Sequence, residues 1–155
     1  MAEKSIPALE DFREKFDQLD VEMEDSLEDF IQQVELLNIP ETLPLDYSRD
    51  SIERIEKLLL YVNEKTIILS DEGIFITKIA RYFGEVVRKH MGGHWALCEN
   101  ANNINYGLPW LTGFKSLSKF GWSPIPVVLN FKMEPRVGLL AKSTKDIFQV
   151  AGGQS

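Results

Sequence analysis

The sequence predicts an α+β fold. N-terminal helices, one long and acidic and two shorter, pack on a small and mainly antiparallel sheet of two to four strands. Two stretches, 9–37 and 76–87, repeat apolar residues every three or four positions, as one face of a helix requires. The second stretch leads through Gly92-Gly93 into HWALCE, and the β-branched run VVLNF follows at 127–131. We expect these last two segments to be strands that pair with each other.

The first helix is predicted to start at residues 5–7 (Ser-Ile-Pro) and to end at residues 38–40 (Asn-Ile-Pro). Nine apolar residues between these signals form a stripe at helical spacing: Leu9, Phe12, Phe16, Leu19, Met23, Leu27, Phe30, Val34 and Leu37. Because the stripe contains no Gly or Pro, one continuous helix is favoured. A break near Asp20-Val21 is the alternative.

The net charge of -7 is unevenly distributed along the chain. Residues 1–64 contain 18 acidic and 6 basic side chains, whereas residues 65–155 contain 6 acidic and 11 basic ones. Five carboxylates lie mostly away from the apolar stripe of the first helix: Glu14, Asp17, Glu24, Asp25 and Glu28. We expect a strongly negative outer face, which repels nucleic-acid phosphates and suits a basic protein partner. The alternative is that this charge only keeps the protein soluble.

Two shorter helices should follow the first. Residues 50–53 (Asp-Ser-Ile-Glu) have the spacing of a capping box, with Asp50 as the cap, and apolar residues then continue at helical spacing to Val62. Ser70 is the expected N-cap of the third helix. Its end is predicted at Gly92 or Gly93, which can adopt the left-handed conformation that stops a helix.

Gly84 lies inside the third helix, where a glycine costs about 1 kcal/mol relative to alanine. We therefore expect a neighbouring helix or strand to pass close to it. The polar face of this helix carries Lys78, Arg81, Glu85, Arg88 and Lys89, and Glu85 is expected to pair with Arg81 and Lys89. This face remains net positive, so it should offer the acidic helix a docking surface within the molecule.

The C-terminal half is less regular. A loop is expected at 100–105, a short strand at 104–107 and an aromatic turn at 108–114, while 115–122 is ambiguous. Ser143 is expected to cap a last helix that runs to Val150. Trp110, Phe114 and Trp122 either cap the core or contact a partner. With 155 residues, 44% of them hydrophobic, we expect a single domain over 1–155.

His90, His94, Cys98 and Glu99 form a cluster of potential metal ligands. Gly92-Gly93 separates the two histidines, so they do not share one helical face, and we interpret all four residues as structural. The single cysteine excludes an internal disulfide. We predict no catalytic residue, no bound metal and no cofactor. A metal-dependent or thiol enzyme that uses these four residues is the alternative.

Two stretches, LDYSRDSIERIEKLLLYV and YFGEVVRKHMGGHW, resemble a pattern in small bacterial proteins. Some relatives of this kind look like immunity proteins of polymorphic or contact-dependent toxin systems. The similarity covers roughly residues 45–132, and its matched residues are fold determinants: Ser51, Phe83, Gly84, Glu85, Gly92, Gly93 and Trp95. The resemblance implies an immunity protein that blocks a cognate toxin by direct contact. The acidic outer face of the first helix, and not the resemblance, suggests that this toxin is basic, for example a nuclease.

The N-terminal sequence MAEKSIPALEDF lacks the apolar run of a signal peptide, and no stretch is long and apolar enough to span a membrane. We therefore expect a cytoplasmic protein with a protein partner and no nucleic-acid or membrane partner. The acidic residues of the first helix and the three aromatic residues Trp110, Phe114 and Trp122 are its predicted contacts. A self-associating adaptor that uses the aromatic residues is a further alternative, and the oligomeric state stays open.

Overall fold

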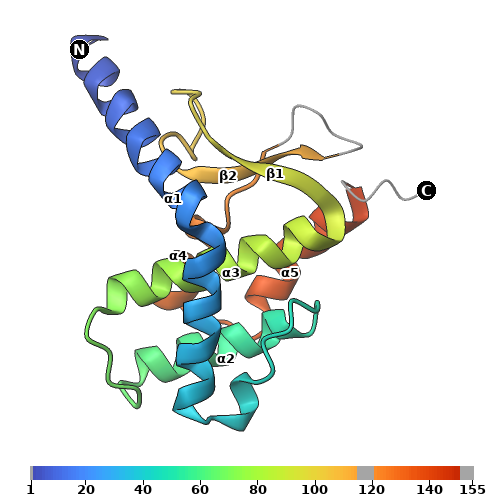
Figure 1. Cartoon of the computed structure of the whole chain (residues 1–155). Coiled ribbons are helices and arrows are strands. Elements are labelled where there is room, and N and C mark those ends of the chain that lie inside the picture. The colour runs from blue at the N-terminus through green and yellow to red at the C-terminus, as the bar shows by residue number, and fades with distance from the viewer. Residues whose placement is uncertain (1, 115–120, 151–155) are drawn as a thin grey trace.

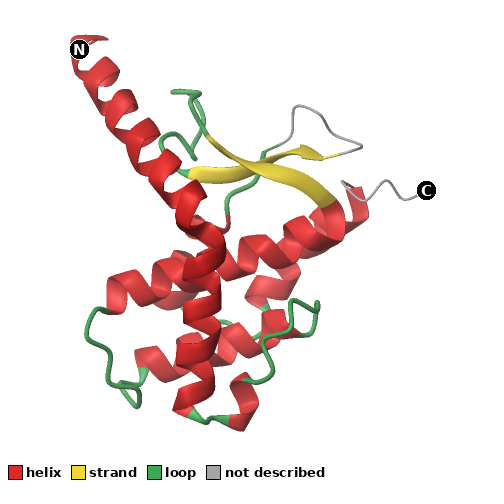
Figure 2. Cartoon of the chain, in the orientation of Figure 1, coloured by secondary structure: helices red, strands yellow, loops and turns green. Residues whose placement is uncertain are grey.

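The computed structural model describes residues 2–114 and 121–150 and confirms the α+β class (Figures 1 and 2). In chain order the elements are α1 (Ala2–Leu37), the short 3-10 helix η1 (Pro40–Thr42), α2 (Ser51–Asn63), α3 (Glu72–Met91), β1 (Gly92–Leu97), β2 (Pro109–Phe114), α4 (Pro124–Met133) and α5 (Leu139–Val150).

The long N-terminal helix is continuous, so the alternative of a break near Asp20-Val21 is wrong. Figure 1 shows α1 crossing α3 and continuing toward α2, while its N-terminal end extends beside the hairpin of β1 and β2. The C-terminal half of α1 is in the core, where Phe30 and Val34 are fully buried. Its N-terminal half is more exposed, because Phe12 and Phe16 are only partly covered.

α3 is the central helix, and Ile79, Phe83 and Val86 are completely buried on it. Its N-cap is Asp71 rather than the predicted Ser70, because the Asp71 Oδ1 accepts a hydrogen bond of 3.0 Å from the Ile74 N–H. The predicted stop is confirmed: Gly92 and Gly93 have φ values of 82° and 83°. β1 begins directly at this turn, with Gly92 as its first residue.

β1 pairs with β2 in an antiparallel ladder, with Gly92 opposite Phe114 and Leu97 opposite Pro109. The segment 108–114, predicted as an aromatic turn, therefore mostly forms a strand. Residues 104–107, predicted as a short strand, form turns instead. An isolated bridge joins Leu111 to Trp122.

The prediction that 127–131 is a strand paired with β1 is wrong, because this run lies inside α4. Ser123 caps the helix, accepting a hydrogen bond of 3.3 Å from the Ile125 N–H, and Pro124 occupies the first turn. Val128 and Phe131 lie three residues apart on one helical face, and both are fully buried. Tertiary packing against α3 therefore overrides the β propensity of the run.

The predicted capping box of α2 is also wrong. The Asp50 side chain makes no capping hydrogen bond, and the Ser48 Oγ instead accepts from the Ser51 N–H at 3.3 Å. α5 begins at Leu139, before the predicted cap Ser143. The N-terminus of α5 is capped by Glu56 of α2, which is distant in the sequence. Its carboxylate accepts hydrogen bonds from the Gly138 N–H at 2.7 Å and from the Leu140 N–H at 3.1 Å.

Candidate functional site

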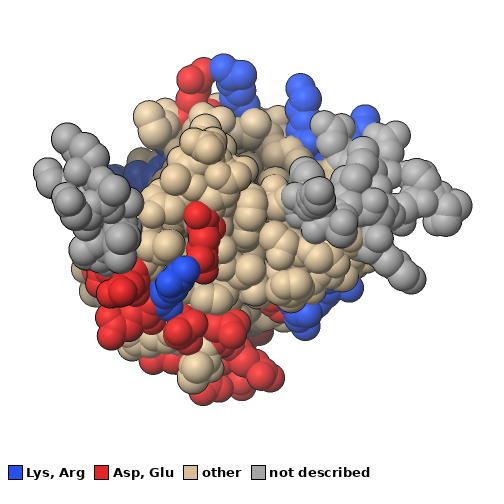
Figure 3. All heavy atoms as spheres, turned by 90° about the horizontal axis from the view of Figure 1, so that it is seen from above, with Lys and Arg blue, Asp and Glu red and all other residues tan. Residues whose placement is uncertain are grey.

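The five carboxylates predicted on the outer face of α1 are all exposed: Glu14, Asp17, Glu24, Asp25 and Glu28. We call this set the acidic face. Among the side chains that the structure describes, none of the five makes an ion pair; α1 makes the ion pairs Arg13–Glu99 and Lys15–Asp11. Figure 3 shows acidic side chains gathered on one side of the molecule, while most basic side chains of this view lie elsewhere.

The polar face of α3 does not neutralise the acidic face. Glu85 pairs with Arg88, through two hydrogen bonds of 2.8 and 2.9 Å, and not with Arg81 or Lys89 as predicted. Lys89 instead places its Nζ 4.8 Å from the centroid of the Tyr47 ring. α1 does pack on α3, but this contact buries apolar residues and leaves the acidic face in solvent.

A cleft of about 560 Å³ lies beside the acidic face, between α1, the C-terminal half of α3, β1 and the loop before α2. Asp20 and Glu24 of α1 line one side, and Arg88 and Lys89 of α3 are also part of its lining. It also contains aromatic and imidazole rings, contributed by Tyr47, His94 and Trp95. The cleft therefore combines charges of both signs with rigid apolar surfaces.

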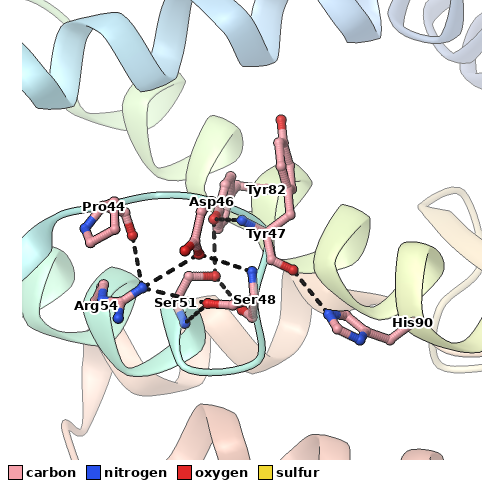
Figure 4. Close-up of polar contacts among 8 residues, drawn as sticks. All are labelled: Pro44, Asp46, Tyr47, Ser48, Ser51, Arg54, Tyr82 and His90. Carbon is pink, nitrogen blue, oxygen red and sulfur yellow. Dashed lines mark hydrogen bonds and ion pairs between the residues drawn. The ribbon is translucent and has the colours of Figure 1, made fainter.

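Tyr47 is held in position by backbone hydrogen bonds on both sides of its Cα atom (Figure 4). Its N–H donates to the Tyr82 hydroxyl at 2.9 Å, and its carbonyl lies 3.0 Å from the His90 Nε2. The Tyr82 hydroxyl in turn donates to the Ser51 Oγ. These contacts maintain the positive φ of 63° at Tyr47, whose ring points toward the side on which α1 runs.

Burial and the neighbouring Tyr82 raise the pKa of Tyr47 to about 12, so its hydroxyl stays protonated at neutral pH. Its ring stacks on that of Tyr82 with 4.8 Å between the centroids. The ring is therefore a fixed, uncharged wall of the cleft.

Trp95 is the second fixed wall. Its indole N–H donates a hydrogen bond of 2.7 Å to Glu85, which is only 6% exposed. Burial raises the pKa of Glu85, but hydrogen bonds from Arg88 and Trp95 outweigh it and leave the pKa below its usual value. The Trp95 ring also lies directly over Gly84, where an added Cβ would be 2.2 Å away, which confirms the predicted close approach by a neighbouring element.

His90, His94, Cys98 and Glu99, the residues of the alternative metal or thiol site, lie in different surroundings. The His90 ring contacts the Tyr47 carbonyl, and the His94 ring packs over Gly113. Cys98 is completely buried, and Glu99 pairs with Arg13 at 2.6 Å. No group of three or more potential ligands that could hold a metal ion occurs among the residues that the structure describes.

The three predicted aromatic contacts have different environments. Phe114 is 1% exposed and belongs to the core, so its ring is not available to a partner in this conformation. Trp110 and Trp122 are partly buried. Trp122 contacts Phe83 edge to face at 5.3 Å, and the Trp110 ring lies against Gly121. Trp122 therefore packs on α3, whereas Trp110 covers the chain at Gly121.

The sequence alone does not indicate that Tyr47 and Trp95 line a cleft. The position of Tyr47 depends on Tyr82, which is 35 residues away, so no local pattern marks it. For Trp95 the sequence contains an indirect signal. Gly84, a glycine inside a helix, predicted a close neighbour but did not identify it as Trp95.

No known protein family, no curated protein and no solved structure matches the chain. Over the described part of the chain, every helix is too short or too polar to cross a membrane.

Proposed function

We propose that this chain is a non-enzymatic cytoplasmic immunity protein, which neutralises a cognate bacterial toxin by direct contact through the acidic face. The observation that carries the proposal is the set of exposed α1 carboxylates without ion-pair partners among the described residues. The resemblance of residues 45–132 to immunity-like proteins supports the toxin as the partner.

The charge of α1 supports a basic partner. Residues 9–37 contain eleven acidic and two basic side chains, and a continuous helix holds them in fixed relative positions. Such a field accelerates the encounter with a positively charged surface and repels like charge, so it contributes to association rate and selectivity more than to affinity.

The cleft supplies the contacts that hold a docked partner. Val21, which is 85% exposed, lies at the cleft beside the carboxylates of Asp20 and Glu24. The ordered rings of Tyr47 and Trp95 complete an apolar surface next to these charges. Pre-ordered aromatic residues at the centre of a contact, with charges around them, are typical of interface hot spots.

The test uses the toxin domain encoded next to the gene for this chain. The wild type should co-purify with that domain, and the triple variant Glu24→Lys, Asp25→Lys and Glu28→Lys should bind at least tenfold more weakly, about 1.4 kcal/mol. Most of this loss should appear in the association rate at low salt and diminish as salt is added.

A matched control reverses three other exposed carboxylates, Glu35, Glu64 and Glu134, to lysine. Each lies at the C-terminal end of a helix, where a lysine is compatible with the helix dipole, and the net charge changes equally. The control should bind within twofold of the wild type. Equal binding by both triple variants would exclude the acidic face, and absence of a complex with the wild type would exclude the immunity function.

A further inference from the structure

A second cavity, of about 280 Å³, shares Trp95 as a lining residue with the cleft. Its lining residues come from α1, α3, β1, the first residue of β2, the turn before β2 and the N-terminal end of α4. Most of its lining side chains are apolar, among them Phe12, Phe16, Leu19, Trp95, Leu97 and Ile125. Its volume is close to the lower end of the range for small-molecule sites, about 300–1,000 Å³. We call it the apolar pocket.

Arg81 of α3 also lines the apolar pocket, and it lacks a carboxylate partner among the described residues. Its Nη1 donates to the Ser26 Oγ at 3.3 Å, whereas its Nε is buried without a hydrogen-bond acceptor. Glu22 attracts Arg81 without a hydrogen bond to it, and burial lowers the pKa of Arg81 below its usual value. A half-buried cation with an unused donor is costly unless an anion accompanies it.

The other charges near this pocket do not supply that anion. Lys15 of α1 is a second basic residue in the lining, and its amine is 3.7 Å from the exposed carboxylate of Asp11. The remaining lining residues carry no acidic group. The lining therefore contains two basic side chains and no acidic one, and most of its other residues are apolar.

We propose that the apolar pocket binds a small monocarboxylic acid with a hydrocarbon body. Its carboxylate lies at the Arg81 guanidinium, whose planar set of donors matches the two carboxylate oxygens. Its hydrocarbon part is covered by the rings of Phe12, Phe16 and Trp95. A neutral lipid would leave Arg81 without a counter-ion, and an organic cation would be repelled by it. This site is separate from the acidic face and does not depend on the proposed immunity function.

The probe pair is octanoate and 1-octanol, which have hydrocarbon tails of the same kind and differ in the charge of the head group. Calorimetric titration of the wild-type chain should show one octanoate per chain, bound at least tenfold more tightly than octanol. Equal affinity for the two compounds, or no binding of octanoate, would overturn the proposal and leave at most an uncharged apolar cavity.

Two variants test whether octanoate binding depends on the positive charge of Arg81. Arg81→Met keeps an unbranched side chain but removes the cation, so octanoate affinity should fall at least tenfold while octanol binding stays within twofold. Lys78→Met removes an equal charge from the same helix at a residue outside this lining, and should change neither affinity. Unchanged octanoate binding by Arg81→Met would overturn the proposal.

Methyl NMR spectra of the wild-type chain establish the position of the probe even if Arg81→Met folds poorly. Octanoate should shift the signals of Leu19, Leu97 and Ile125, which line the pocket. The exposed Leu36 and Ile68 lie outside the pocket lining and should not move. Shifts confined to exposed residues such as Leu36 and Ile68 would show adventitious binding and would contradict the proposal.

Discussion

Replacement of Gly84 by alanine tests how tightly β1 is fixed on α3. The new Cβ would lie 2.2 and 2.5 Å from two ring carbons of Trp95 and 3.2 Å from the Pro124 Cγ. Cβ atoms essentially never come closer than 3.0 Å to non-bonded heavy atoms of other residues, so the indole must move. Movement is opposed by the 2.7 Å hydrogen bond from its Nε1 to the buried carboxylate of Glu85.

Two effects of opposite sign determine how Gly84→Ala changes the free energy of unfolding. An alanine inside a helix is favoured over glycine by about 1 kcal/mol. Inserting a methyl group into a packed contact costs about 1–3 kcal/mol, and loss of a hydrogen bond to a charged group costs about 1.5–3 kcal/mol. We therefore expect Gly84→Ala to lower the free energy of unfolding by roughly 2–4 kcal/mol.

Urea unfolding followed by circular dichroism measures this change. Gly73→Ala is the control in the same helix, because its new Cβ would meet only the Asp71 Oδ1 at 3.5 Å, an ordinary contact. This control should be as stable as the wild type or slightly more stable. In a Trp95→Ala background the indole is absent and only the 3.2 Å contact with the Pro124 Cγ remains, so Gly84→Ala should become neutral or stabilising. A Gly84→Ala protein as stable as the wild type would show that the Trp95 ring is not fixed over Gly84.

Three further changes test other contacts. The pKa of Glu85 is lower in the folded chain than its unfolded value of 4.5. Ionised Glu85 therefore stabilises the fold fully at pH values above 4.5, and this stabilisation is lost as the pH falls through the folded pKa. Glu85→Gln should therefore destabilise the chain most near pH 7, and the difference from the wild type in urea unfolding should shrink below pH 4.5. Glu56→Ala leaves the start of α5 without its cap and should cost about 1–3 kcal/mol, while hydrogen exchange should increase first in α5. Phe131→Ala should cost about 3–5 kcal/mol in the same unfolding assay, and Leu129→Ala, at a position 47% exposed, much less; equal effects would contradict the packing of α4.

Local sequence determined the helices that carry the candidate sites. The apolar stripes of α1, α2 and α3 repeat at helical spacing, and the Gly92-Gly93 turn is encoded by two adjacent residues that tolerate positive φ. The acidic face was predictable for the same reason, since helical spacing alone places its carboxylates away from the buried stripe. Only the structure shows that they lack ion-pair partners among the described residues.

Tertiary structure decided the parts that depend on distant residues. The run 127–131 has β-branched residues typical of a strand, yet burial of Val128 and Phe131 against α3 makes it a helix. The start of α5 depends on Glu56, whose carboxylate accepts a hydrogen bond from the Gly138 N–H although the two residues are 82 positions apart. Periodicity and local caps act over a few neighbouring residues and can be read from them. Strand pairing, long-range caps and clefts arise only when separated segments come together.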